Sequence, residues 1–128
     1  MNREEYNVLG GEILDASIVV HKEMGPGLME SVYHQCLFRE LNSRDIICKS
    51  EVLLPLHYKG EKLDKTFKID LLVEGEIIIE LKAAEAILPV HEAQIISYLK
   101  LANKKLGYLI NFNTPLLKDG FKRFVNNF

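Results

Sequence analysis

Asp70 and the triplet from Glu80 to Lys82 are the residues of this chain whose types and spacing best suit catalysis. They lie in two short apolar runs, residues 67–73 and 77–81. Both runs alternate, so each predicts a strand whose odd-numbered residues share one face. The opposite face then carries Asp70, Glu80 and Lys82, two carboxylates and an amine. That set suits a divalent metal with a lysine beside it.

The loop between the two strands decides whether the acids meet. A loop of residues 74–76 pairs Asp70 with Glu80 and Lys68 with Lys82. Opposed side chains are ~5 Å apart, and two carboxylates there repel unless a cation lies between them. A two-residue turn would instead put the acids on opposite faces, unless a bulge restored the pairing. The other interpretation of the alternation is a solvated, salt-bridged strand face.

Composition predicts one globular domain spanning residues 1–128. The apolar content is 48% and the charged content 27%, as in soluble proteins, and no apolar run approaches the ~20 residues of a membrane helix. Acids stand near the N-terminus where a signal peptide would be apolar. Cys36 and Cys48 lack metal-ligand spacing and suit buried, reduced thiols, so we expect a cytoplasmic protein.

Charge is distributed unevenly along the chain. The formal net charge of −2 argues against a protein that binds polyanions through bulk charge. Residues 97–128 nevertheless hold six of the 16 basic side chains and only one of the 18 acidic ones. A basic segment beside an acidic cluster fits a site that holds metal and contacts phosphate. A solvated lysine-rich surface is the other interpretation and, for this feature alone, is favoured.

Periodicity predicts two helices, three strands, a helix, a strand and a tail. The helices are expected at residues 4–22, 29–43 and 91–101, and the strands at residues 46–58, 67–73, 77–81 and 106–112. Pro55 marks the first strand as an edge strand. Because a helix links the third and fourth strands, we expect those two to be parallel with a right-handed crossover.

Glu30 stands out in the second expected helix. Tyr33, Leu37 and Leu41 follow it at offsets of 3, 7 and 11, so Glu30 shares a face with residues that should be buried. The helix dipole alone favours a carboxylate in the first turn. Its alignment with an apolar stripe indicates in addition that Glu30 points into a polar site.

Several short motifs, each weak alone, occur in an order and spacing that are specific. They are Gly27-x-x-Glu30-x-x-Tyr33, Lys68-Ile-Asp70-Leu, Glu80-Leu-Lys82, Gln94-x-x-x-Tyr98, Pro89-Val-His91, residues 109–113 and residues 117–120. With them the chain resembles proteins of the GxxExxY type, a family placed in the PD-(D/E)XK nuclease superfamily. One departure from the superfamily's name is that Ile69, rather than proline, precedes Asp70. The resemblance implies a restriction-endonuclease-like α/β fold: a central mixed four-stranded sheet flanked by helices, in the order α-α-β-β-β-α-β.

The resemblance also implies a metal site. Asp70 and Glu80 would hold a divalent cation, Mg²⁺ or alternatively Mn²⁺, with the backbone carbonyl of Leu81 as a third ligand. Oxygen ligands suit such a hard ion, which keeps several waters. Glu30 would contact the cation directly or through water.

Further residues receive roles in the reaction. Lys82 would position and help deprotonate the attacking water and stabilise charge that develops on phosphate. Gln94 would orient water or phosphate, and Lys68 is a candidate contact to the nucleic-acid backbone. His91 is of interest because it opens the helix that carries Gln94.

These observations lead to a metal-dependent nuclease or nuclease-like protein that hydrolyses phosphodiester bonds, with DNA favoured over RNA. Two other classes stay open: a binding module that keeps the metal or nucleic-acid site without cleaving, and an interaction protein within a larger complex. The chain has no room for a separate DNA-reading domain, which favours a homodimer or a larger complex. No membrane partner is expected.

Overall fold

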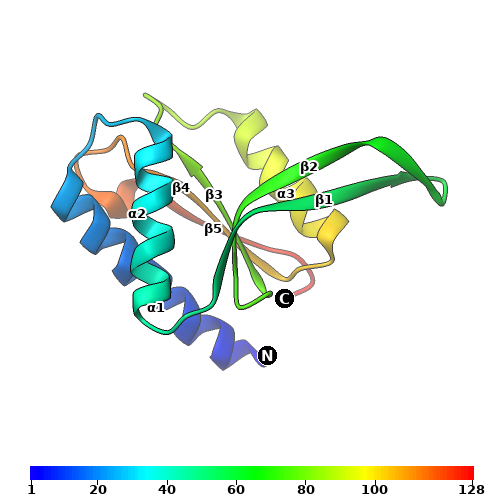
Figure 1. Ribbon diagram of the computed structural model, residues 1–128, viewed down its shortest axis with the longest axis horizontal. Coiled ribbons are helices and arrows are strands. Elements are labelled where there is room, and N and C mark those ends of the chain that lie inside the picture. The colour runs from blue at the N-terminus through cyan, green and yellow to red at the C-terminus, as the bar shows by residue number, and fades with distance from the viewer.

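The computed structural model describes residues 1–128 and shows one mixed sheet with helices on both faces (Figure 1). The elements in chain order are α1 (Arg3–Met24), α2 (Glu30–Ser43), β1 (Cys48–Tyr58), β2 (Glu61–Val73), β3 (Ile77–Lys82), α3 (Pro89–Ala102), β4 (Leu106–Asn111), a 3₁₀ turn (Leu117–Gly120) and β5 (Phe121–Val125). The strands lie in the order β1-β2-β3-β4-β5. Neighbours are antiparallel except β3 and β4, which are parallel as expected, with α3 as the crossover.

The helix boundaries follow from local chemistry. Asn2 caps α1: its side chain accepts the Glu5 N–H at 2.8 Å, and the Glu5 carboxylate accepts the Asn2 N–H at 3.0 Å. Gly25, with φ of 72°, ends α1 in a conformation that side-chain-bearing residues avoid. Pro89 opens α3, where its missing N–H costs nothing. The structure therefore starts α3 two residues before the predicted start.

The sheet separates two apolar clusters. Helices α1 and α2 cover one face, where Ile13, Ala16, Leu37 and Leu41 pack on odd-numbered residues of β3 and even-numbered residues of β4. Helix α3 covers the other face, where Ile95, Tyr98 and Leu99 pack on Ile78 and Leu109. Both faces of β3 and β4 are thus buried, which explains the near-continuous apolar sequence of these strands.

The register between β2 and β3 is the one that the three-residue loop predicts. Val73 pairs with Ile77 and Leu71 with Ile79, so the two-residue turn is excluded. The regular ladder ends at the pair of Leu71 and Ile79. Beyond it β2 and β3 part, and Asp70 and Glu80 occupy the place where the next pair would lie. The expected pairing of Lys68 with Lys82 is wrong, because the β2–β3 ladder ends at Leu71 and Ile79 and does not reach Lys68.

The β1–β2 hairpin changes faces at Asp70. Leu71 and Val73 pack with the α1–α2 cluster, whereas Ile69 packs with the α3 cluster, although all three are odd-numbered. Glu51, which lies opposite Asp70 in the register, has φ of 54°, a left-handed conformation that rotates the strand. The prediction of one continuous apolar face over residues 67–73 is therefore wrong. Beyond this switch the hairpin extends as an arm past the body of the molecule (Figure 1).

The C-terminal segment corrects the expected fold in one respect. The sheet has five strands rather than four, because residues 121–125 form β5 along β4, preceded by the 3₁₀ turn. Gly120 is required at this turn, since a Cβ there would lie 2.0 Å from the Asn111 carbonyl oxygen. Phe128 packs edge-on against Tyr6 of α1 at 5.7 Å, so the two chain ends lie side by side.

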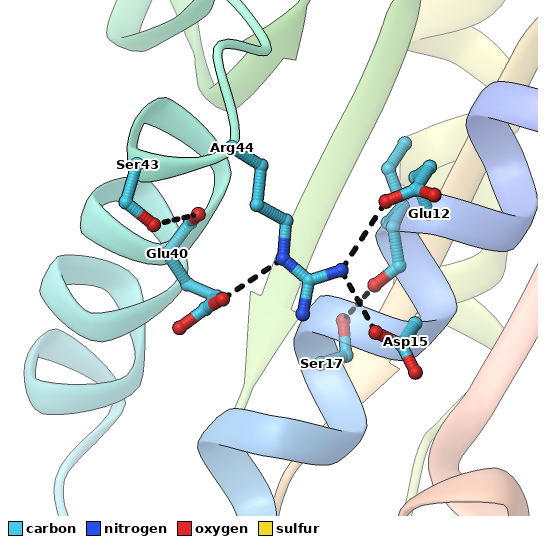
Figure 2. Close-up of polar contacts among 7 residues, drawn as sticks. Glu12, Asp15, Ser17, Glu40, Ser43 and Arg44 are labelled. Carbon is cyan, nitrogen blue, oxygen red and sulfur yellow. Dashed lines mark hydrogen bonds and ion pairs between the residues drawn. The ribbon is translucent and has the colours of Figure 1, made fainter.

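Arg44 joins the two helices that cover the first face (Figure 2). Its guanidinium lies 2.8 Å from Asp15 and 3.2 Å from Glu12 of α1, and 2.8 Å from Glu40 of α2. These hydrogen bonds to carboxylates raise the pKa of Arg44 above its already high ordinary value. The guanidinium therefore stays charged and fixes the end of α2 on α1. Ser17 of α1 satisfies its buried hydroxyl within its own helix, by donating to the Ile13 carbonyl at 2.7 Å.

Candidate functional site

Asp70 and Glu80 are locked together by reciprocal hydrogen bonds where β2 and β3 part. The Asp70 N–H donates to Glu80 Oε2 at 2.8 Å, and the Leu81 N–H donates to Asp70 Oδ2 at 2.8 Å. Each carboxylate thus replaces a missing ladder bond of the facing strand and is held by it. The two acids meet across the hairpin as the sequence predicts, through side-chain to main-chain bonds rather than as a regular pair.

The arrangement has the donor chemistry of a divalent-metal site. Each of the two carboxylates uses one oxygen in these bonds and leaves the other available. The N–H of Leu81 points toward β2, and because N–H and C=O of one strand residue project to the same side, its carbonyl points there too. Side chains alone do not complete a site, since no group of three His, Cys, Asp or Glu residues could hold a metal ion. The residues that could hold one are therefore the two acids with the Leu81 carbonyl and water.

Glu80 carries the strongest electrostatic signal of the site. It is only 6% exposed. Burial, followed by the charge of Asp70, raises its pKa to about 8, and Lys82 and the hydrogen bond from Asp70 oppose this only in part. A cation between the acids would reverse the effect, because it would stabilise both negative charges.

Glu30 lies in the first turn of α2, which covers the face of the sheet opposite α3. Glu30 is exposed at the start of α2, yet partial loss of solvent raises its pKa first and Asp70 raises it further, while Lys82, His34 and His91 lower it. These effects require all of these groups to be near Glu30. Glu30, Asp70, Glu80 and Lys82 therefore lie within electrostatic reach of one another. Sequence reasoning had not singled out His34, which lies one helical turn after Glu30 and bonds Ser50 through Nε2 at 2.6 Å.

Tyr33 fixes the loop from which Glu30 emerges. Its hydroxyl donates to the Gly25 carbonyl at 2.5 Å and accepts the Leu28 N–H at 3.1 Å. Its ring stacks on Phe112 at 4.6 Å and 6°. Gly27, with φ of 95°, lets the loop turn before α2. The three motif residues thus have separate tasks: Gly27 allows the turn, Glu30 belongs to the site, and Tyr33 anchors the loop.

Asn111 holds the chain that follows Lys82. It is 3% exposed, and its amide accepts the Ala84 N–H at 3.1 Å and donates to the Ala84 carbonyl at 2.9 Å. Next to it, the Phe112 N–H donates to the Lys82 carbonyl at 3.0 Å. Sequence reasoning gave Asn111 no role. The available signal was a polar residue within a fully buried apolar strand, because buried amides need partners.

Gln94 and Tyr98 lie on α3 beside the acids. Gln94 Nε2 donates to the Tyr98 hydroxyl at 2.8 Å. Burial raises the pKa of Tyr98, the bond from Gln94 lowers it, and Glu80 and Asp70 raise it. Tyr98 therefore lies within electrostatic reach of both carboxylates, and Gln94 is next to it without bonding either acid. His91 Nδ1 accepts the Leu88 N–H at 3.1 Å and so fixes the start of this helix.

Lys68, the predicted contact to the nucleic-acid backbone, is not among the residues that bond Asp70 or Glu80. It is exposed on the hairpin arm and lies between Phe67 and Ile69, which face α3. By alternation its side chain points away from α3.

A mixed α/β sheet with two acids at a strand divergence and a lysine two residues later defines a restriction-endonuclease-like protein. The chain belongs to the PD-(D/E)XK nuclease superfamily, whose family model matches residues 7–124. Nucleases of this superfamily act on nucleic acid and typically use divalent metal ions.

Comparison with solved structures supports the fold alone. The protein described as "Crystal structure of SSO0001" aligns with a TM-score of 0.50 and 22% identity, over 73% of this chain. The chain spans only 47% of that protein. No curated protein matches the sequence. None of the helices combines the length and apolar character that a membrane span requires.

Proposed function

We propose that this chain is a metal-dependent nuclease of the GxxExxY type that hydrolyses phosphodiester bonds. The observation that carries the proposal is the reciprocal locking of Asp70 and Glu80, which holds two carboxyl groups side by side where a bound cation would stabilise both negative charges. The motif residues Gly27, Glu30 and Tyr33 support the finer family assignment, because each has a distinct task around the same site.

We assign each residue a role consistent with its position. Asp70, Glu80 and the Leu81 carbonyl would hold Mg²⁺ or Mn²⁺, with Glu30 as a contact from α2, direct or through water. When bound, such an ion would supply polarisation of the phosphate and a lower pKa of water. Lys82 orients the attacking water, helps remove its proton and stabilises the negative charge that grows on the phosphate.

The remaining parts of the proposal concern the setting of the reaction. Gln94 orients water or phosphate from α3, and Lys68 contacts the nucleic-acid backbone from the arm. We propose DNA rather than RNA as the substrate and one catalytic domain over residues 1–128, acting as a homodimer or in a larger complex. Cys36 and Cys48 are both free thiols, which fits a reducing cytoplasm.

Cleavage assays with matched lysine variants test the proposal. Single-stranded, duplex and flap substrates of DNA and RNA are incubated with Mg²⁺, Mn²⁺ or EDTA and wild type, Lys82→Ala or Lys22→Ala. Lys22 is exposed in the last turn of α1 and controls for loss of one positive charge. We expect metal-dependent cleavage that Lys82→Ala lowers by roughly 10²-fold or more and Lys22→Ala leaves unchanged.

The possible failures have different meanings. If wild type and Lys82→Ala are both inert with every substrate and metal, the protein is a binding module and not a nuclease. If both cleave equally in a metal-dependent way, the assignment of Lys82 is wrong. Thermal melting with Mg²⁺ verifies that Lys82→Ala still binds the ion, because its carboxylate ligands are intact.

A further inference from the structure

A small pocket lies between the hairpin arm and α3, directly beside the candidate active site. Its volume is about 330 Å³, near the lower limit for small-ligand pockets. Its lining contains no charged residue and consists of Phe67, Val90, Ala93, Gln94, Ser97 and Tyr98. A neutral, partly aromatic lining suits an uncharged planar group better than a phosphate.

Phe67 gives this pocket a stacking surface. Its ring centroid lies 5.0 Å from that of Tyr98, at an angle of 35°. Tyr98 is buried, yet Phe67 remains 38% exposed and Val90 across the pocket 65% exposed. An aromatic ring that is supported from behind and open in front can stack with a flat ligand at little conformational cost.

Two polar groups can recognise the edge of such a ligand. Gln94 Nε2 donates a hydrogen bond to the Tyr98 hydroxyl. This bond fixes the amide and leaves Gln94 Oε1 as an acceptor. Ser97 is exposed and contributes a hydroxyl. Nucleobases combine a planar aromatic face with donors and acceptors along their edges, so they match both features of the pocket.

The position of the pocket connects it to the cleaved strand. Phe67 precedes Asp70 by three residues on β2, which corresponds to ~10 Å along a strand. Tyr98, at the floor of the pocket, lies within electrostatic reach of both Asp70 and Glu80. A base in this pocket would therefore belong to a nucleotide within one or two positions of a phosphate held at the metal site.

We propose that this pocket receives an unpaired nucleobase next to the cleaved phosphate, stacked on Phe67. This inference rests on the proposed nuclease function and deepens it by naming the substrate class. A base in a continuous duplex is paired and stacked, and it must be extruded before it can enter. The substrates are then single strands, flaps or loops rather than uninterrupted duplex.

Binding measurements without cleavage test the pocket separately from catalysis. Fluorescence anisotropy in EDTA at fixed salt compares single-stranded and duplex oligonucleotides of equal length, for wild type, Phe67→Ala and Leu53→Ala. Leu53 is the matched control because it is a 62% exposed apolar residue of the same hairpin that does not line the pocket. We expect Phe67→Ala to weaken single-strand binding by roughly 5- to 150-fold, and Leu53→Ala to leave it unchanged.

An abasic scan of the oligonucleotide then identifies the base itself. In wild type, one abasic position should weaken binding, and in Phe67→Ala the same position should have no further effect, since the stacking partner is already gone. Phe67→Leu keeps apolar packing on Tyr98 but removes the aromatic ring, so it gives the same answer if Phe67→Ala folds poorly. Circular dichroism and thermal melting establish that each variant is folded.

The outcomes separate this proposal from the nuclease proposal. Coupling between Phe67 and one base, in a protein that cleaves nothing, supports the pocket and rejects the nuclease. Metal-dependent cleavage without such coupling supports the nuclease and rejects the pocket. Equal binding of duplex and single strand by wild type, or equal abasic losses in wild type and the Phe67 variants, also overturns the pocket.

Discussion

Without metal, Glu80 should make the protein less stable as pH rises. Burial and the neighbouring charge of Asp70 raise its pKa from 4.5 to about 8. Between these two values the unfolded chain has lost the proton and the folded protein still holds it. Because the folded state binds more protons there, increasing pH favours unfolding. The loss of stability reaches its full size only above pH 8, where Glu80 has lost its proton in the folded state as well.

The size of this effect follows from the two pKa values. At about 1.4 kcal/mol per pKa unit, the difference between 4.5 and 8 corresponds to ~5 kcal/mol. Such a loss is comparable with the whole stability of a small domain. Glu80→Gln removes the charge but keeps an oxygen that can accept the Asp70 N–H. The variant should therefore match wild type near pH 4.5 and exceed it by several kcal/mol above pH 8.

Urea unfolding in EDTA between pH 4.5 and 9 measures this difference. Glu85→Gln is the control, because Glu85 is an exposed acid in the loop after β3 and its variant should follow the wild-type curve. Adding Mg²⁺ above pH 8 should recover about half of the lost wild-type stability, ~2.7 kcal/mol at a hundredfold excess over Kd, and should do little for Glu80→Gln. Parallel curves for wild type and Glu80→Gln across the whole range would refute the reasoning.

Two further predictions concern the residues that position the site. Tyr33→Phe keeps the stack on Phe112 but loses both bonds to the loop before α2, so we expect ~1–3 kcal/mol lower stability in urea and weaker Mg²⁺ binding by titration. Unchanged Mg²⁺ affinity would show that the loop does not position Glu30. Asn111→Ala leaves both backbone groups of Ala84 without partners and should cost at least ~2 kcal/mol. An unfolding free energy equal to that of wild type would contradict its role as an anchor.

Local patterns were sufficient to predict the centre of the site. Alternation in β2 and β3, with a loop around Gly75, predicted the pairing that brings Asp70 to Glu80, and the ladder from Val73 and Ile77 confirms the register. The apolar stripe of α2 predicted the burial of Tyr33, Leu37 and Leu41, all of which are 0% exposed. These predictions succeeded because a strand or helix that buries one face must repeat with the period of its own geometry.

Features that depend on distant partners could not be predicted in this way. β5 has little apolar alternation and no fully buried residue, and it exists through its pairing with β4. The face switch needs a left-handed Glu51, and glutamate carries no sequence signal for that conformation. The position of Lys68 followed from the same switch, which a strict period-two pattern cannot represent.

The face switch divides the hairpin into a part of fixed length and a part whose length is free. On the body side, residues of β1 and β2 pack with α1 and α2, so inserting a residue there would displace Asp70. On the far side, residues 57–66 are all exposed, and an arm residue that contacts the body, Phe67 on Tyr98, lies between them and Asp70. The tip can therefore gain or lose matched residues on both strands while Asp70 and Glu80 stay in place. Related chains can evolve arms of different reach around one unchanged pair of carboxyl groups.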